Sequence, residues 1–254
     1  MDRDEARRKL EFYRDLGIRE LHVRSLPAPP ETVTEFEGAE APAPAVKAVS
    51  AETPVPAVLS MTPDDDSLPR ILDDMGNCTR CKLHRGRTNL VFGVGNPQAK
   101  LVFVGEGPGA DEDAQGIPFV GRAGQLLTQM IEGTAAKEGI QVQRPDVYIC
   151  NVVKCRPPEN RTPEPDEMQT CGQFLFRQLM TIQPRAICAL GSTAAKALLG
   201  TKDGVMKLRG RWHKWRDVPL MVTYHPSYLL RAYNVQAKRE AWEDLKKVLH
   251  YVYD

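Results

Sequence analysis

The stretch KLVFVGEGPGADEDAQGIPFVGRAGQLL, residues 100–127, decides how this chain folds. Its apolar, β-branched run at 101–104 predicts a buried strand over 100–104. A glycine-rich loop with acidic residues follows, and a helical pattern then begins at 122, with its apolar residues on one face: Leu126, Leu127, Met130 and Ile131. Because a strand that leads through a loop into a helix places that loop at the carboxyl edge of a sheet, we expect ligands to bind here. The glycine spacing matches neither the dinucleotide-binding pattern nor the phosphate-binding P-loop, which argues against a nucleotide cofactor.

Three more apolar runs, at 147–153, 186–190 and 220–224, predict further buried strands. Helical patterns lie at 68–75, 122–137, 164–182, 192–199 and 237–252, and the segment 212–219 can add a small hairpin before the last strand. Strands that alternate with helices of this length favour a parallel sheet covered by helices on both faces. The sequence therefore predicts an α/β fold.

The first 69 residues differ in composition from the rest of the chain. Residues 1–25 are expected to contain a short amphipathic helix at 4–21, which is either an appendage or a docking helix for a protein partner. Residues 26–69 contain nine prolines, eight acidic residues and one aromatic residue. Such a segment cannot bury enough apolar surface to offset the entropy of ordering, so we expect a disordered, flexible linker. The folded domain is expected over 70–254.

Charge and hydropathy narrow the environment in which the protein works. Residues 70–254 carry 26 basic and 19 acidic side chains, a surplus that suits a polyanionic partner but also occurs on ordinary protein surfaces. No apolar run approaches the roughly 18 residues needed to span a bilayer, and the charged N-terminus is unlike a signal peptide. We therefore expect a cytoplasmic protein that does not enter membranes.

Four of the six cysteines have a spacing that suits a metal site. Cys78 and Cys81 form a CxxC pair, which can bind one metal centre from a single turn, and Cys155 and Cys171 form a distant pair that can close the site. The spacing does not distinguish a zinc ion from an iron–sulfur cluster, and a structural role follows from it more readily than a redox role. The other two cysteines lie inside predicted strands, where we expect them in the core: Cys150 and Cys188.

Polar side chains follow several of the predicted strands at one edge of the sheet. Glu106 follows the first strand, Asn151 comes with the second, and His225 follows the last. Together with the aromatic ring of Phe119, they can converge in one crevice. An amide can pair with the donor and acceptor edge of a pyrimidine, and an aromatic face can stack on its ring. These residues predict a pocket for a nucleobase.

Several of these motifs, in this order, resemble one known family. The segments GEGPGADED, GIPFVGRAGQLL, NVVKCRPPENRTP and TYHPSYLLR, with the upstream CxxC pair and the downstream Cys171, are similar to the family 4 uracil-DNA glycosylases, the iron–sulfur branch of that superfamily. The resemblance covers about residues 70–250 and leaves 1–69 unmatched. It implies a three-layer α/β/α sandwich around a four-stranded parallel sheet. It also implies a monomeric DNA-repair enzyme that flips uracil out of single- or double-stranded DNA and excises it hydrolytically, leaving an abasic site.

The resemblance also implies roles for matching residues. Glu106 would position the hydrolytic water or stabilise the sugar cation, and His225 would face the carbonyl that gains negative charge. The substrate-binding residues would be Gly107 through its backbone, Glu112 against the methyl position of thymine, Phe119 by stacking, Asn151 by hydrogen bonds and Arg231 near the DNA backbone. A [4Fe-4S] cluster would be held by Cys78, Cys81, Cys155 and Cys171.

Two positions depart from patterns in related enzymes. Ala110 stands where family members often carry an acidic residue. Gly107 stands where the best-known uracil glycosylases have a catalytic aspartate, which is normal for family 4 but leaves the catalytic carboxylate open. The alternative function is a non-catalytic or covalently trapping uracil-DNA-binding protein with a structural metal site. A related branch traps DNA through a histidine in the loop after the second strand. Because no histidine lies between His84 and His213 here, we expect ordinary turnover.

Overall fold

The computed structural model describes residues 66–254, so the predicted helix at 4–21 lies outside the described residues. Six strands of the described chain form one sheet in the order β1-β3-β2-β4-β6-β5. Their bounds are β1 Val94–Gly95, β2 Leu101–Gly105, β3 Tyr148–Asn151, β4 Ala186–Leu190, β5 Trp212–Trp215 and β6 Val218–Thr223.

The four inner strands, β3, β2, β4 and β6, run parallel to one another, at the four positions that the sequence predicted. The predicted total of four strands is wrong, because an antiparallel strand borders the sheet at each edge. β5 forms the expected hairpin with β6, whereas β1 pairs with β3 through two residues only. Both additions lie outside the inner strands, so the α/β class and the carboxyl edge remain as predicted.

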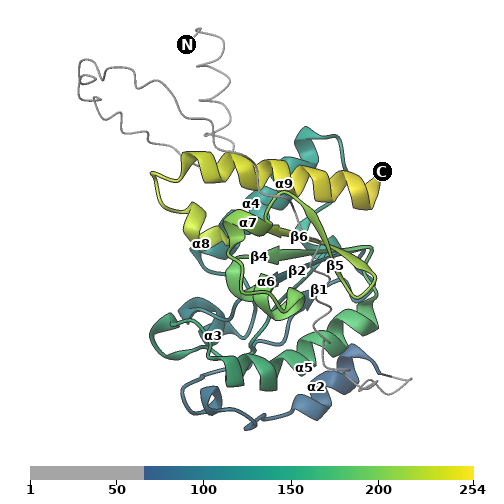
Figure 1. Cartoon of the computed structure of the whole chain (residues 1–254). Helices are drawn as coiled ribbons and strands as arrows, with labels where there is room; N and C mark the ends of the chain where they lie inside the picture. The colour runs from purple at the N-terminus through teal and green to yellow at the C-terminus, as the bar shows by residue number, and fades with distance from the viewer. Residues whose placement is uncertain (1–65) are drawn as a thin grey trace, which may run out of the picture.

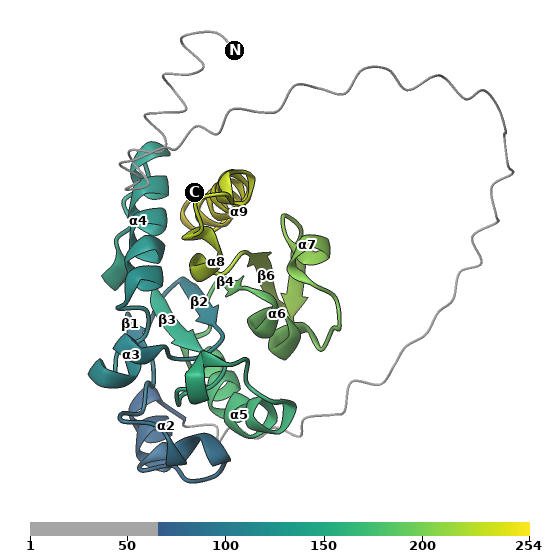
Figure 2. The same cartoon turned by 90° about the vertical axis from the view of Figure 1, so that its left-hand side faces the viewer.

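Helices cover both faces of this sheet, as Figures 1 and 2 show. α4 and α9 pack together on one face, and α5, α2 and α6 lie on the other. The segment α3 and the short helix α8 flank the carboxyl ends of the inner strands. The helix bounds are α2 Leu68–Met75, α3 Ala110–Gln115, α4 Arg122–Lys137, α5 Pro165–Ile182, α6 Ser192–Leu199, α7 Val205–Leu208, α8 Pro226–Leu229 and α9 Val235–Tyr253.

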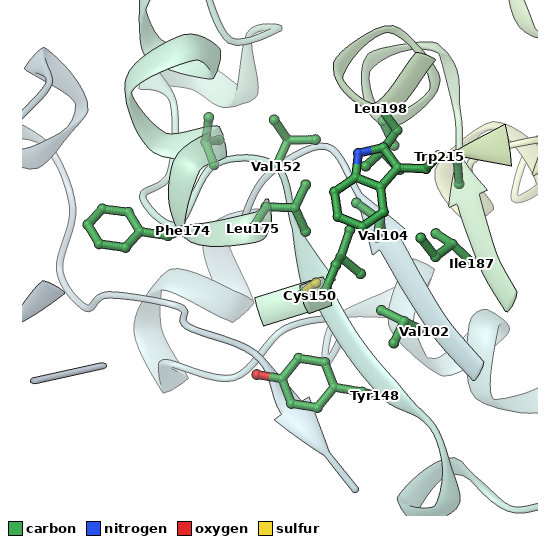
Figure 3. Packing of buried hydrophobic residues seen from close by; sticks show 14 of the residues in the cluster. Val102, Val104, Tyr148, Cys150, Val152, Phe174, Leu175, Ile187, Leu198 and Trp215 are labelled. Carbon is green, nitrogen blue, oxygen red and sulfur yellow. The ribbon is translucent and has the colours of Figure 1, made fainter. Parts of the chain in front are cut away.

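Two separate cores result from the alternation of side chains along the strands. Along β2, Val102 and Val104 point to the α5 face, while Leu101 and Phe103 point to the face covered by α4 and α9. Figure 3 shows the first core, in which strand side chains meet Leu175 of α5. Because the inner strands are buried on both faces, they appear in the sequence as continuous apolar runs.

The start of α5 shows how local sequence places a functional residue. Pro165 occupies the first turn, where a missing N–H costs nothing. The carboxylate of Glu167 accepts a hydrogen bond from the backbone of Glu164 at 2.7 Å, which caps the helix. The helix then presents Cys171 toward the core, in the helical segment that the sequence predicted.

Among the described residues, no helix is both long and apolar enough to cross a lipid bilayer.

Candidate active site and cysteine site

A cavity of about 330 Å³ opens at the carboxyl edge of the sheet, between the loops that follow the inner strands. Its lining includes six of the seven residues predicted for catalysis and substrate binding: Glu106, Gly107, Glu112, Phe119, Asn151 and His225. The seventh, Arg231, lies outside the cavity on the exposed turn after α8. Its guanidinium sits 5.9 Å from the centre of the Tyr228 ring and donates a hydrogen bond to the Tyr233 hydroxyl at 3.2 Å.

Glu106 lies directly beyond β2 and is held through both its backbone and its side chain. Its carbonyl accepts a hydrogen bond from the backbone N–H of Val153 at 3.2 Å, which extends the β2–β3 pairing past the strand ends. Its carboxylate accepts a hydrogen bond from the hydroxyl of Thr193, in the first turn of α6. Sequence reasoning missed Thr193, since a threonine in a helical pattern carries no local functional signal.

Phe119 and Asn151 form the buried inner wall of the cavity, and two glycines make room for them. A Cβ atom on Gly105 would lie 2.4 Å from Asn151 Oδ1 and 2.6 Å from Phe119 Cζ, so only glycine fits at that strand end. A Cβ on Gly124 would lie 1.9 Å from the Phe119 backbone. Gly105 thus lets the phenyl ring and the amide approach the end of β2, and Gly124 lets the Phe119 backbone pack against α4.

The side-chain oxygen of Asn151 is buried and has no hydrogen-bond partner in the described part of the chain. Leaving a buried acceptor without a partner costs about 1–3 kcal/mol. Native structures tolerate few such groups, and many of those they keep serve a ligand or water. The amide at the end of β3 is therefore poised to bind a polar ligand in the cavity.

His225 follows β6 and acts as the N-cap of α8. Its Nδ1 atom accepts a hydrogen bond from the backbone N–H of Ser227 at 3.2 Å, which leaves Nε2 to carry the proton of a neutral ring. Burial lowers the pKa of His225 to about 4, against a smaller opposing effect from Glu112. The imidazole is therefore a neutral hydrogen-bond donor at pH 7. Its ring centre lies 5.7 Å from that of Phe119.

Glu112 joins the two loops that form the outer wall. Its carboxylate accepts hydrogen bonds from the backbone N–H groups of Gly109 at 3.1 Å, Val120 at 3.0 Å and Gly121 at 2.9 Å. The side chain thus fixes the approach of the glycine-rich loop to the turn that contains Phe119. The sequence could not predict this bracing contact, because its partners are backbone groups.

Gly107 is packed tightly against the neighbouring loop. A Cβ atom at this position would lie 2.7 Å from Cγ2 of the buried Val153. Any larger residue here, including the aspartate of the best-known uracil glycosylases, requires Val153 to move. Glycine at this position therefore fits the present packing of Val153 in this chain.

The four predicted cysteine ligands lie around one small second cavity, of about 10 Å³: Cys78, Cys81, Cys155 and Cys171. Hydrogen-bond donors surround their sulfur atoms. Arg87 donates to Cys155 Sγ at 3.1 Å, and the backbone N–H of Lys154 donates to Cys171 Sγ at 3.2 Å. Such donors suit thiolates bound to a metal centre.

The cysteine site does not have the geometry of a compact single-ion site. In the described part of the chain, no group of three or more histidine, cysteine, aspartate or glutamate side chains is placed to hold a metal ion. Burial raises the pKa of the Cys171 thiol to about 12. The four thiols suit a metal centre that prefers soft thiolate ligands, and they line the same small cavity. Cys150 and Cys188 are buried in the core, as predicted.

The sequence of this chain matches that of a known class of proteins. Residues 92–246 match the family model of the uracil DNA glycosylase superfamily. The match includes all the cavity residues named above, and it begins after Cys78 and Cys81.

The relatives narrow the class to one branch. A type-4 uracil-DNA glycosylase of Thermotoga maritima is 48% identical over 177 residues, which are 69% of this chain and 89% of the relative. One from Archaeoglobus fulgidus is 42% identical over 191 residues, 72% of this chain and 92% of the relative. A type-5 uracil-DNA glycosylase of Pyrobaculum aerophilum is 32% identical over 169 residues, 61% of this chain and 71% of the relative. The chain belongs to the type-4 uracil-DNA glycosylase family.

Proposed function

We propose that the protein excises uracil from DNA by hydrolysing the bond between the base and the deoxyribose. The observation that carries this function is the unpartnered, buried amide oxygen of Asn151, which lies in one cavity with the ring of Phe119 and the imidazole of His225. A base must leave the DNA stack to reach such a cavity, and uracil is easiest to extrude where it is mispaired or single-stranded.

Base recognition would use the inner wall of the cavity. The Phe119 ring offers a stacking face, and the Asn151 amide offers a donor and an acceptor to one edge of the base. Uracil presents an N–H donor next to a carbonyl acceptor on that edge, which matches an amide. The backbone N–H of Gly107 would bind a carbonyl of the base from the opposite loop.

The bond that breaks joins N1 of uracil to C1′ of the sugar. Its electron pair leaves with uracil, a water oxygen forms the new bond to C1′, and the proton released by water balances the uracil anion. The neutral His225 would donate its Nε2 proton as a hydrogen bond to the carbonyl that gains charge. A donor fixed in place stabilises the transition state more than the ground state. Glu106, fixed by Thr193, would orient the water and face the developing sugar cation.

Two further residues would determine what enters the cavity. Glu112 holds the turn that contains Phe119 through the backbone N–H groups of Val120 and Gly121. A thymine methyl group would therefore meet a wall that cannot move without breaking these hydrogen bonds. Arg231, exposed on the turn after α8, would contact the phosphate backbone. Both assignments extend the roles that the resemblance implied.

The cysteine site would hold a [4Fe-4S] cluster through Cys78, Cys81, Cys155 and Cys171. Four thiols around one cavity, with guanidinium and backbone donors to sulfur, support this assignment. The cluster would supply a structural cross-link between the segment before β1, the loop after β3, and α5. No step of the hydrolysis requires it.

A release assay tests the proposed function. The full chain would be incubated with end-labelled oligonucleotides that carry uracil, thymine or cytosine at one position, single- or double-stranded, and base release and DNA binding would be measured separately. We expect release from uracil-containing strands only. Binding of uracil-containing DNA without release would support the alternative, a non-catalytic or covalently trapping uracil-DNA-binding protein.

A further inference from the structure

Lys154 is a lysine that the fold buries almost completely. Its side chain is 1% exposed, although lysine is among the residue types least often found inside proteins. Its Nζ atom donates hydrogen bonds to the backbone carbonyl of Asn151 at 2.9 Å and to Oε1 of Gln178 at 2.6 Å. Among the described residues, no carboxylate pairs with it. The burial of a flexible polar side chain at this position therefore needs a reason other than an ion pair.

The same residue also touches the cysteine site through its backbone. Its N–H donates to Cys171 Sγ at 3.2 Å, and the next residue in the chain is Cys155. Its carbonyl accepts a hydrogen bond from the backbone of Val91 at 2.8 Å. Lys154 thus contacts the Cys171 thiol with its backbone and the base-binding residue Asn151 with its side chain.

Gln178 holds the ammonium group of Lys154 in place from the side of α5. It lies on α5, the helix that also carries Cys171, and its Nε2 donates to the Tyr148 hydroxyl at 3.2 Å and to the carbonyl of Phe92 at 3.1 Å. Figure 3 shows that Tyr148 and Cys150 of β3 project toward the side of the sheet on which α5 carries Leu175. Lys154 therefore ties the end of β3 to α5.

We propose that Lys154 is a positioning residue that couples the cysteine site to base recognition. By holding the carbonyl of Asn151, it fixes the backbone at the end of β3 and with it the direction of the amide that faces the base. This inference rests on the proposed function, because it assumes that Asn151 binds uracil. This positioning role explains why a lysine occupies this part of the core, where an apolar residue would need no hydrogen-bond partner.

The test compares two variants of the same buried network. Lys154→Met keeps an unbranched side chain of similar volume, one heavy atom shorter, but cannot donate to Asn151. Tyr148→Phe removes one hydrogen bond from Gln178 and leaves the bond between Lys154 and Asn151 in place. For each variant, as purified with its metal centre, the affinity for free uracil, the metal content, the absorbance spectrum and the melting temperature would be measured.

We expect Lys154→Met to weaken uracil binding at least tenfold while the metal content stays at the wild-type level, and Tyr148→Phe to bind uracil like the wild type. Unchanged uracil affinity in Lys154→Met, or an equal loss in both variants, would overturn the inference. If Lys154→Met alone does not fold, Gln178→Leu is compared with Lys154→Met/Gln178→Leu: both lack the Gln178 bonds to Tyr148 and Phe92, so they differ only in the Lys154 donor, and the same tenfold loss of uracil affinity is expected between them. Failure of the wild type to bind or release uracil would instead refute the proposed function.

Discussion

At the scale of single residues, the cavity depends on how closely its walls approach one another. Gly105 admits the Phe119 ring, Gly124 admits the Phe119 backbone, and Gly107 lets the glycine-rich loop lie against Val153. These positions have little to do with turn flexibility, since none of the three has a positive φ. They are glycines because the neighbouring atoms occupy the space that a Cβ would need.

The contact between Gly107 and Val153 leads to a stability prediction. Gly107→Ala should destabilise the protein by about 1–3 kcal/mol, the usual cost of overpacking. In a Val153→Ala background the same substitution should cost much less, because the clashing methyl group is gone. Denaturant unfolding of the wild type, both single variants and the double variant gives the coupling energy. An equal cost of Gly107→Ala in both backgrounds would contradict the packing argument.

The ionisation of His225 leads to a second prediction. Burial lowers the pKa of His225 to about 4 from the ordinary value of 6.5. The ring is therefore neutral in the folded protein above about pH 4, whereas in the unfolded chain it is charged below pH 6.5. The resulting contribution to stability is complete above pH 6.5 and is lost as the pH falls toward 4. An NMR titration of the His225 ring, assigned with His225→Asn, should show a midpoint near pH 4. A midpoint at pH 6 or higher would refute the neutral-donor role.

The residues of the cavity could be predicted to different degrees. Glu106, Asn151 and His225 follow or end buried strands, and such positions in parallel sheets meet at one edge, so the sequence was sufficient to bring them together. Thr193 and the backbone partners of Glu112 escaped prediction, because their contacts depend on how α6 and two loops pack in space. Arg231 ends the motif TYHPSYLLR and was predicted near the DNA backbone; it lies outside the cavity on the exposed turn after α8, and its contact with DNA stays a prediction.

At the scale of elements, β3 and the loop after it connect the two sites. β3 ends at Asn151, and four residues later the chain reaches Cys155. The inner strands were predictable from their apolar runs. β1 was not, because its two exposed residues include a glycine and it gains strand geometry only by pairing with β3. The edges of the sheet therefore depend on tertiary contacts, and the centre depends on local sequence.

The cysteine site gives a prediction at this scale. Cys155→Ala or Cys171→Ala should lose the broad absorption near ~400 nm that is typical of iron–sulfur proteins and should melt at a lower temperature, because the loop after β3 is no longer held to α5. Cys188→Ala, a buried cysteine on the opposite face of the sheet, serves as the control and should keep the absorption. Zinc in place of iron in the purified wild type would contradict the cluster.

At the scale of the whole molecule, the first cavity lies at the carboxyl edge of the sheet, which α3 and α8 flank (Figure 1), and Cys155 follows β3 at the same edge. We expect the basic surplus of residues 70–254 to supply counter-charges for DNA phosphates. This overall arrangement could be predicted from the order of strands and helices. The sequence could not specify which basic side chains lie at the cavity rim.

Salt dependence tests the contribution of Arg231. Binding of a non-cleavable uracil analogue in single-stranded DNA should weaken with salt, and Arg231→Ala should reduce the logarithmic salt slope by about 0.7 for one lost phosphate contact. Lys100→Ala, an exposed lysine at the amino end of β2 on the opposite edge of the sheet, should leave the slope unchanged. Equal slopes for the wild type and Arg231→Ala would place Arg231 away from the DNA backbone.

The most direct test of the proposed uracil site is the single-turnover rate of uracil release by the wild type and by Asn151→Ala. Melting temperature and metal content are recorded for both proteins. We predict that the wild type releases uracil and that Asn151→Ala loses at least a hundredfold in rate, with folding and metal content retained, because the amide no longer holds the base. Release by Asn151→Ala at close to the wild-type rate would contradict the assignment of this cavity as the uracil site.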